Sequence, residues 1–136
     1  MFPLYDTVHS RRFPVINLML ILINVLAFLY EIQMDPSALK EVIFEWGLIP
    51  ARLLSDPSTA WKTIFTSMFL HGGWFHIINN MWVLFIFGDN VEARMGGIRY
   101  LIFYLLCGVA AVFLQTYILP SSNVPMIGAS GAVAGV

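Results

Sequence analysis

The chain of 136 residues is 59% hydrophobic and only 11% charged, and its mean hydropathy is +0.79. A soluble domain carries roughly 25% charged residues, so this composition excludes an ordinary soluble protein and indicates a membrane protein. The net charge of -1 comes without a basic cluster, which gives no indication of nucleic-acid binding. The single cysteine, Cys107, excludes a disulfide within the chain.

A first membrane-spanning helix is expected over residues 14–32. Pro14 suits the first turn of a helix, and the polar side chains of the segment are Asn17, Asn24 and Glu31. About 18 residues rising ~1.5 Å each cover roughly 27 Å, close to the thickness of a bilayer core. Asn17 and Asn24 share a helical face, which we expect to meet other helices because a lone amide facing lipid is unfavourable.

Residues 33–72 are too mixed to span a membrane and too apolar for an ordinary solvated loop. The pair Asp35-Pro36 starts a helix that Gly47 ends, and a second short helix is expected from Pro57. In the first of these, apolar residues recur at i, i+3, i+4 and i+7: Leu39, Val42, Ile43 and Trp46. This pattern predicts an amphipathic helix lying in the membrane interface.

A second spanning helix is expected over residues 74–88, and it contains His76, Asn79 and Asn80. Polar residues inside a span are costly, so they are candidates for function. His76 and Asn80 are four residues apart and share one helical face. The alternative is that they only bond neighbouring helices, but the glycine-rich break just before them, which carries His71, favours a functional cluster.

A polar turn is expected over residues 89–97, followed by a third spanning helix over 98–119. In the turn, Glu92 and Arg94 could form a pair or bond the ends of adjacent helices. If these two residues are considered alone, a solvated charge cluster is the simpler explanation.

Ser130 lies among small residues at the start of a fourth helix, expected over 130–136. A serine is a poor nucleophile until a base takes its proton. Gly131 and Gly135 form a small-xxx-small pair that allows close helix packing, so a purely structural helix seam is one alternative. A soluble α/β-hydrolase elbow needs Gly-x-Ser-x-Gly, and Ala132 breaks that pattern.

The arginines predict the orientation of the chain. Two lie in the N-terminal tail and two lie between the second and third helices: Arg11, Arg12, Arg94 and Arg99. The positive-inside rule then places the N-terminus in the cytoplasm. Ser130 and His76 both enter the membrane from the outer side, so their depths can match.

Three motifs resemble those of the rhomboid intramembrane serine proteases. Residues 61–80, which contain His71, His76 and Asn80, resemble the entry to that family's second helix. Residues 91–96 resemble its Glu-x-Arg turn, and Gly128-Ala129-Ser130-Gly131 resembles its Gly-x-Ser-Gly motif. The motifs occur in family order with family-like spacing. The resemblance covers nearly the whole chain.

The resemblance implies an all-α membrane protein with a rhomboid-like helical bundle. Residues 1–136 would form a single incomplete domain: three transmembrane helices, the start of a fourth, and the interfacial amphipathic loop. The protein would be a multi-pass integral membrane protein of a prokaryotic plasma membrane. Its partners would be the lipid bilayer and transmembrane protein substrates, with no nucleic acid and no metal or organic cofactor.

The resemblance also implies roles for individual residues. Ser130 would be the nucleophile of a Ser-His dyad that cleaves transmembrane helices near the outer face. The side chains of His76 and Asn80, with the Ser130 backbone N–H, would bind the oxyanion. The motif glycines would be Gly128 and Gly131, and His71 would be a structural residue that holds the long loop. Glu92 and Arg94 would be structural residues that tie this loop and helix ends together at the cytoplasmic side.

The chain departs from the family pattern in one major respect. Rhomboids have a catalytic histidine in their sixth helix, whereas this chain holds only His9, His71 and His76. We therefore expect a fragment that is inactive alone and needs the C-terminal helices of its own chain. A catalytically inactive rhomboid-like protein that binds transmembrane segments is the main alternative. A smaller departure is Trp61-Lys62, where many members have Trp-Arg, because lysine cannot make the forked contacts of arginine.

Overall fold

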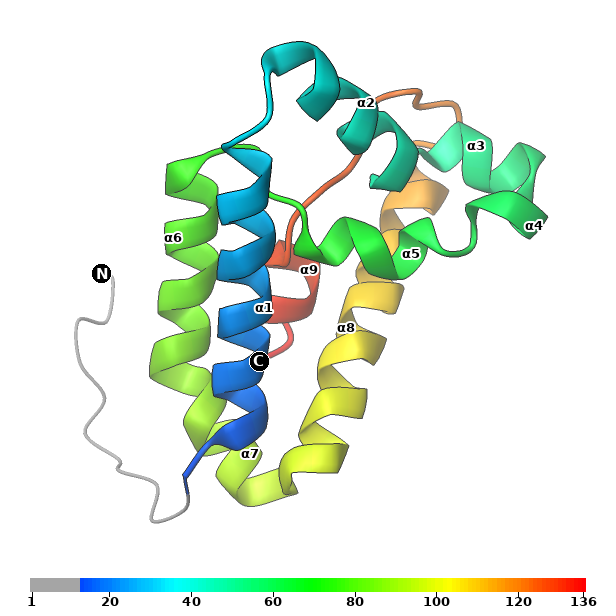
Figure 1. Cartoon of the computed structure of the whole chain (residues 1–136). Helices are drawn as coiled ribbons and strands as arrows, with labels where there is room; N and C mark the ends of the chain where they lie inside the picture. Colours follow the sequence, from blue (N-terminus) through cyan, green and yellow to red (C-terminus); the bar gives the residue numbers. More distant parts are fainter. Residues whose placement is uncertain (1–12) are drawn as a thin grey trace.

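The computed structural model describes residues 13–136, which fold as helices and contain no strand (Figure 1). The all-α prediction is therefore confirmed. The helices are α1 (Val15–Glu31), α2 (Pro36–Trp46), α3 (Pro50–Ser55), α4 (Pro57–Ala60), α5 (Thr63–Thr66), α6 (Trp74–Val83), α7 (Asp89–Met95), α8 (Gly97–Ile118) and α9 (Ser130–Val133). A 3₁₀ turn covers Ser67–Phe69, and one wider, π-helical stretch covers Leu84–Gly88.

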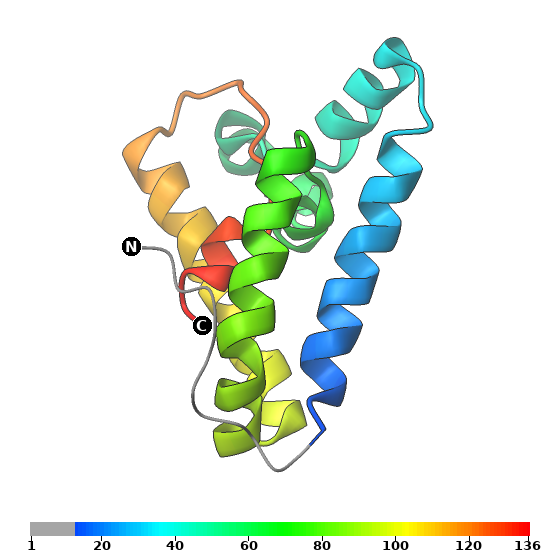
Figure 2. The same ribbon diagram turned by 90° about the vertical axis from the view of Figure 1, so that its left-hand side faces the viewer.

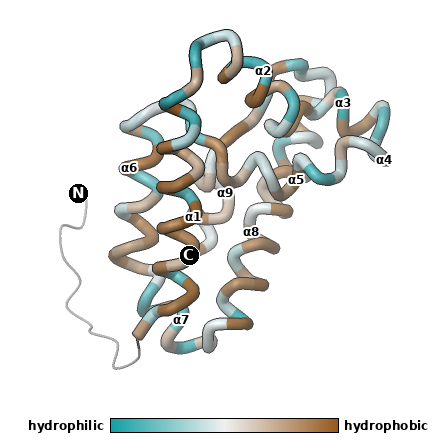
Figure 3. The backbone as a smooth tube through the Cα atoms, in the orientation of Figure 1, coloured by the Kyte–Doolittle hydropathy of each residue, from teal (hydrophilic) through white to brown (hydrophobic). Residues whose placement is uncertain are grey.

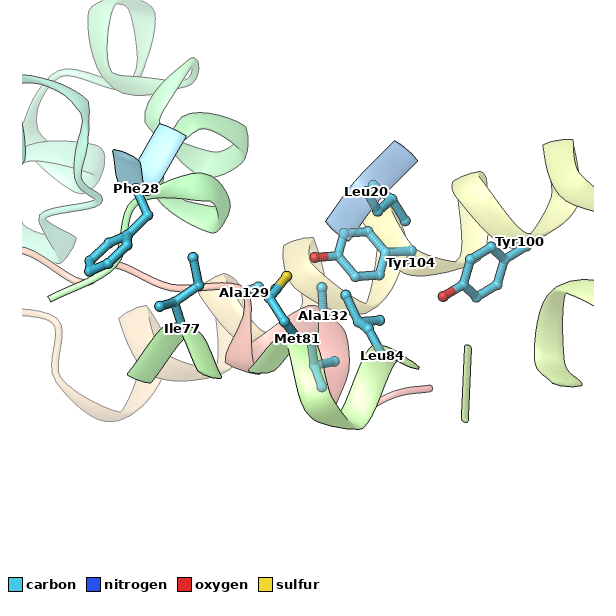
Figure 4. Close-up of a cluster of buried hydrophobic side chains, with 10 residues drawn as sticks. Leu20, Phe28, Ile77, Met81, Leu84, Tyr100, Tyr104, Ala129 and Ala132 are labelled. Atoms are coloured by element: carbon cyan, nitrogen blue, oxygen red, sulfur yellow. The ribbon is translucent and has the colours of Figure 1, made fainter. Parts of the chain in front are cut away.

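Three long rods form the body of the fold: α1, the continuous helix from α6 through α7, and α8 (Figures 1 and 2). The short helix α9 lies among them, while α2 to α5 gather at one end of the rods. The buried apolar core joins all three rods to α9 (Figure 4). Its buried members are Leu20, Phe28, Ile77, Met81, Leu84, Tyr100, Tyr104, Ala129, Ala132 and Val133.

The expected turn over residues 89–97 is wrong, because the chain stays helical to Met95. The first strong break is Gly96, whose φ of 83° lies in the left-handed region that glycine favours. Gly88 was expected to end the second helix, yet it lies inside it. A side chain at this position would collide with Asn17, so Gly88 allows α1 to approach closely.

The polar face predicted for α1 is confirmed. Asn17 and Asn24 are 1% and 0% exposed. The Asn17 amide donates to the Leu84 carbonyl at 2.8 Å, and its oxygen accepts from the Tyr100 hydroxyl at 2.7 Å. The Asn24 amide donates to the Leu20 carbonyl, also at 2.8 Å. The two amides therefore lie in the helix interface, and Asn17 links all three rods.

Among the described residues, α8 is the one helix long and apolar enough to cross a membrane, while α1 has 17 residues and is shorter. Large apolar side chains of the rods are exposed. Figure 3 shows that hydrophobic residues recur along all three rods. Examples of the exposed side chains are Leu22, Leu26, Phe75, Phe85, Leu106 and Phe113. Such extended exposed apolar surface is typical of contact with lipid or with further protein. Spanning by α1 and by residues 74–88 stays a prediction.

The segment 33–72 contains the expected short helices. Asp35 caps α2 by accepting from the backbone N–H groups of Ser37 and Ala38 at 3.0 and 3.1 Å. Gly47 ends α2, and a further helix begins at Pro57, as predicted. The location of this segment in the membrane interface stays a prediction.

Glu92 fastens the beginning of α1. Its carboxylate is 7% exposed and accepts from the backbone N–H groups of Ile16 and Asn17 at 3.1 and 2.7 Å. These donors have no partner within the helix, and a negative charge is favourable at a helix N-terminus. The sequence resemblance had Glu92 and Arg94 tie helix ends to the long loop. Instead, α7 lies at the opposite end of α1 from that loop, and Arg94 is exposed without an ion pair to any described residue.

Replacing Glu92 with alanine should lower the free energy of unfolding by roughly 2–4 kcal/mol, because two backbone donors lose their acceptor. Glu92→Gln keeps one acceptor oxygen and should cost less. Thermal unfolding in detergent measures both changes. The matched control is Glu41→Ala, which removes an exposed acid from α2. Equal melting temperatures for Glu92→Ala and Glu41→Ala would contradict the capping role.

Candidate active site

Ser130 begins α9 and is exposed to a pocket of about 270 Å³. The pocket lies between α8, the 3₁₀ turn and the segment leading into α9. Its lining includes Ser67, Met68, Gly108, Ala111, Gln115, Met126 and Gly128. The Ser130 hydroxyl is therefore accessible from a cavity although its neighbours Ala129 and Ala132 are buried.

The backbone before Ser130 is held on two sides. Met126 and Leu48 exchange two antiparallel hydrogen bonds, with N···O distances of 2.7 and 3.0 Å. Two residues later, the Gly128 N–H donates to the Ser67 carbonyl at 2.8 Å. The segment that precedes the serine is thus fixed by residues from the long loop on both sides.

Gly128 brings this segment against His76. Its φ of 119° lies in the region that favours glycine, and a Cβ here would overlap the His76 ring at Cε1 and Nε2. The imidazole therefore lies directly on the Gly128 backbone, two residues before Ser130. Glycine is required at this position both for its backbone conformation and for this contact.

Gly131 serves packing between helices. A Cβ at Gly131 would stand 2.5 Å from the Ala111 Cβ, and one at Gly135 would overlap the Cys107 side chain. The two glycines therefore let α9 approach α8 closely, as their spacing predicts. The structural-seam explanation holds for Gly131 and Gly135, whereas Gly128 contacts His76 and Ser130 lines the pocket.

Asn80 is 6% exposed, and its Nδ2 donor has no hydrogen-bond partner among the described residues. A buried donor without a partner is costly and is uncommon in folded proteins. His76 is half-buried and lies one helical turn before Asn80 on α6. The structure thus places an imidazole and an unpaired amide on the helix that faces the Gly128 segment.

His71 is 2% exposed and packs against His76, with ring centroids 5.1 Å apart. It lies in the loop before α6, where burial, with the nearby His76 as a second cause, lowers its pKa to about 4. The ring is therefore neutral near pH 7, and its Nδ1 lies 3.3 Å from the Phe69 carbonyl, which can accept a hydrogen bond from it. His71 supports the turn that leads into α6.

Glu31 is a residue whose role the sequence did not predict. Its carboxylate is 2% exposed and accepts from the His71 backbone N–H at 3.2 and 3.3 Å. The signal was present, because an acid at the end of an apolar span is costly unless it has a partner. Glu31 anchors the His71 turn, and through it the start of α6, to the end of α1.

No general base contacts Ser130 in the part of the chain that the structure describes. Its hydroxyl forms no side-chain hydrogen bond there, while His71 and His76 pack against each other. His9 falls outside the described residues. Residues 13–136 also contain no group of three or more potential metal ligands.

Comparisons with known proteins identify the family of the chain. A sequence profile of the rhomboid domain matches residues 58–136. The chain is 39% identical over 77 residues to Rhomboid-like protein 11, chloroplastic, of Arabidopsis thaliana, a match covering 57% of this chain and 27% of that protein. It is 25% identical over 126 residues to the putative rhomboid protease YdcA of Bacillus subtilis, covering 93% of this chain and 60% of YdcA.

A third relative is Inactive RHOMBOID-like protein 8 of Arabidopsis thaliana, 28% identical over 105 residues, or 76% of this chain and 28% of that protein. The chain thus spans between 27% and 60% of the lengths of these relatives. No solved structure matches it significantly. The profile match covers more than half of the chain and includes the Ser130 segment, His76 and Asn80, so the chain belongs to the rhomboid family, whose members are integral membrane proteins.

Proposed function

We propose that this chain carries the nucleophile and oxyanion pocket of an intramembrane serine endopeptidase. The observation that carries the proposal is the contact between Gly128 and His76. It sets the serine segment against a helix that also carries the unpaired amide of Asn80. An oxyanion would supply the acceptor that the Asn80 amide lacks among the described residues.

In the proposed reaction, the Ser130 hydroxyl attacks a peptide carbonyl, the C–N bond breaks and the amine leaves, which gives an acyl-enzyme that water then hydrolyses. The negative oxygen of the tetrahedral intermediate accepts hydrogen bonds from His76, Asn80 and the Ser130 backbone N–H. Each such donor in a dry site is typically worth about 3 kcal/mol. The proton of Ser130 passes to a histidine outside these 136 residues, completing the Ser-His dyad, and no metal or organic cofactor takes part.

The proposed substrates are transmembrane helices of other proteins. A helix in lipid satisfies its own carbonyls, so the substrate must unwind locally before Ser130 can attack. The chain is proposed to cross the membrane several times, with a cytoplasmic N-terminus and Ser130 opening towards the outer face of a prokaryotic plasma membrane. The tail arginines on which this orientation rests lie outside the described residues.

Replacing Ser130 with alanine in the full-length protein should reduce cleavage by roughly a thousandfold or more, because the acyl-enzyme can no longer form. The assay uses liposomes with a fluorescent transmembrane substrate. Residues 1–136 alone should be inactive in the same assay. Cleavage that survives Ser130→Ala would exclude the mechanism, and cleavage by residues 1–136 alone would exclude a base from outside them.

The second candidate is an inactive rhomboid-like protein that binds transmembrane segments. The observation that favours it is the 28% identity to a relative that is itself named inactive. This candidate predicts that the full-length protein retains a transmembrane peptide in co-purification but cleaves none. It also predicts that Ser130→Ala leaves this retention unchanged.

A further inference from the structure

The carboxyl end of α2 is capped almost entirely by two side chains from the following helices. The last carbonyls of a helix have no partner within it. Here the Arg52 guanidinium donates to the carbonyls of Phe44, Gly47 and Glu45 at 2.8, 2.9 and 3.4 Å. The Thr66 hydroxyl donates to the remaining carbonyl, that of Trp46, at 2.7 Å.

All the side-chain hydrogen bonds of Arg52 go to this end of α2. The ion pair among the described residues joins Lys62 to Glu45, so Arg52 has no acidic partner there. Its positive charge instead faces the negative end of the α2 dipole, which is favourable. Arginine suits this position because its planar fork presents several fixed donors, whereas lysine offers one compact ammonium group.

The capped end of α2 leads directly into the backbone that supports Ser130. Leu48 follows Gly47, is 0% exposed and exchanges its two hydrogen bonds with Met126. A third hydrogen bond joins the two loops, from the Ala51 N–H to the Ser122 carbonyl at 3.1 Å. A Cβ on Gly47 would come within 3.1 and 3.2 Å of the Ile127 and Pro125 side chains. The end of α2 therefore also packs closely against residues 125–127.

We infer that Arg52 is a positioning residue for catalysis: by fixing the end of α2 it sets the Leu48–Met126 pairing and hence the placement of Ser130. The inference rests on the proposed protease function. Thr66 shares the task, because it caps Trp46 while its neighbour Ser67 binds Gly128. Arg52 touches neither the pocket nor Ser130 itself.

The role predicts a particular kinetic effect. Loss of the Arg52 guanidinium should let residues 126–130 shift relative to His76 on α6. The start of α6 is held separately, through the contact between Glu31 and His71. A displacement of about 1 Å between reacting groups can cost roughly a hundredfold in rate. The loss should appear in kcat, with KM little changed, because Arg52 lies outside the pocket that Ser130 lines.

The test uses the full-length protein in liposomes with a fluorescent transmembrane substrate. Arg52→Gln should lower kcat at least tenfold and slow the reaction of Ser130 with a fluorophosphonate by a similar factor. Arg52→Lys should restore only part of either rate. The matched control is Lys40→Gln, which removes an exposed charge from α2 and should leave both rates unchanged. Melting temperatures are recorded for every variant.

Unchanged kcat and fluorophosphonate rate in Arg52→Gln would overturn the inference. A rise in KM with kcat unchanged would also overturn it, and so would an Arg52→Lys variant with the rates of the unaltered protein. If Arg52→Gln fails to fold, kcat and the fluorophosphonate rate are measured for Arg52→Lys and Thr66→Val instead. Each of these variants weakens the cap on the carboxyl end of α2 while keeping a similar side-chain volume, and unchanged rates in both would overturn the inference. Ser130→Ala, measured in parallel, separates the two claims: activity surviving that change defeats the protease proposal itself, whatever Arg52→Gln does.

Discussion

Replacing Gly128 with alanine is expected to lower kcat/KM by roughly a hundredfold or more. The new Cβ would overlap the His76 ring, and the φ of 119° is strained for any residue with a side chain. Relief requires either the imidazole or the serine segment to move, and both belong to the proposed oxyanion pocket. A shift of about 1 Å suffices for an effect of this size.

Gly72→Ala is the matched control for this prediction. A Cβ at Gly72 meets only the Ile127 side chain, at an ordinary contact distance of 3.7 Å, so activity should stay close to that of the unaltered protein. Both variants are compared in the liposome cleavage assay. If Gly128→Ala cleaves as fast as Gly72→Ala, the contact between Gly128 and His76 has no part in catalysis.

Replacing Asn80 with alanine should lower kcat by roughly a hundredfold, the usual effect of removing one oxyanion donor. Thermal stability should stay the same or rise, because the buried Nδ2 has no hydrogen-bond partner among the described residues. This opposite behaviour of rate and stability is what distinguishes a functional amide from one that bonds helices together.

Asn79→Ala controls for the loss of an asparagine from the same helix, because position 79 lies on a different face of α6. Its kcat should be close to that of the unaltered protein. A melting temperature that falls by several degrees in Asn80→Ala, with kcat unchanged, would assign Asn80 to helix packing. That result would remove it from the oxyanion pocket.

Residue patterns predicted the helices well where a local signal marks their ends. Asp35 and Gly47 bound α2 because capping is a local interaction between neighbours in the sequence. The polar run after Gly88 was misread because charged residues in a helix look the same as charged residues in a turn. The close approach of Asn17 and of the Tyr100 hydroxyl explains why a glycine stands inside that helix.

In the candidate site, too, residues in motifs were predicted and residues that act through tertiary contacts were not. Ser130, His76 and Asn80 were identified from motif resemblance and helical spacing, and the structure places the first two beside the same glycine. The supporting contacts of Glu31 and Arg52 were not predicted. Both bind backbone groups that no motif marks: Glu31 accepts from a turn 40 positions away, and Arg52 reaches back eight positions to the end of α2.

The account depends most on Ser130 as the nucleophile, and covalent labelling tests it most directly. The full-length protein in liposomes is treated with a fluorophosphonate, digested and analysed by mass spectrometry. The account predicts one adduct, on the peptide containing Ser130, with loss of cleavage in proportion to its formation. Complete labelling of Ser130 with cleavage intact, or inactivation through an adduct on another residue, would contradict it.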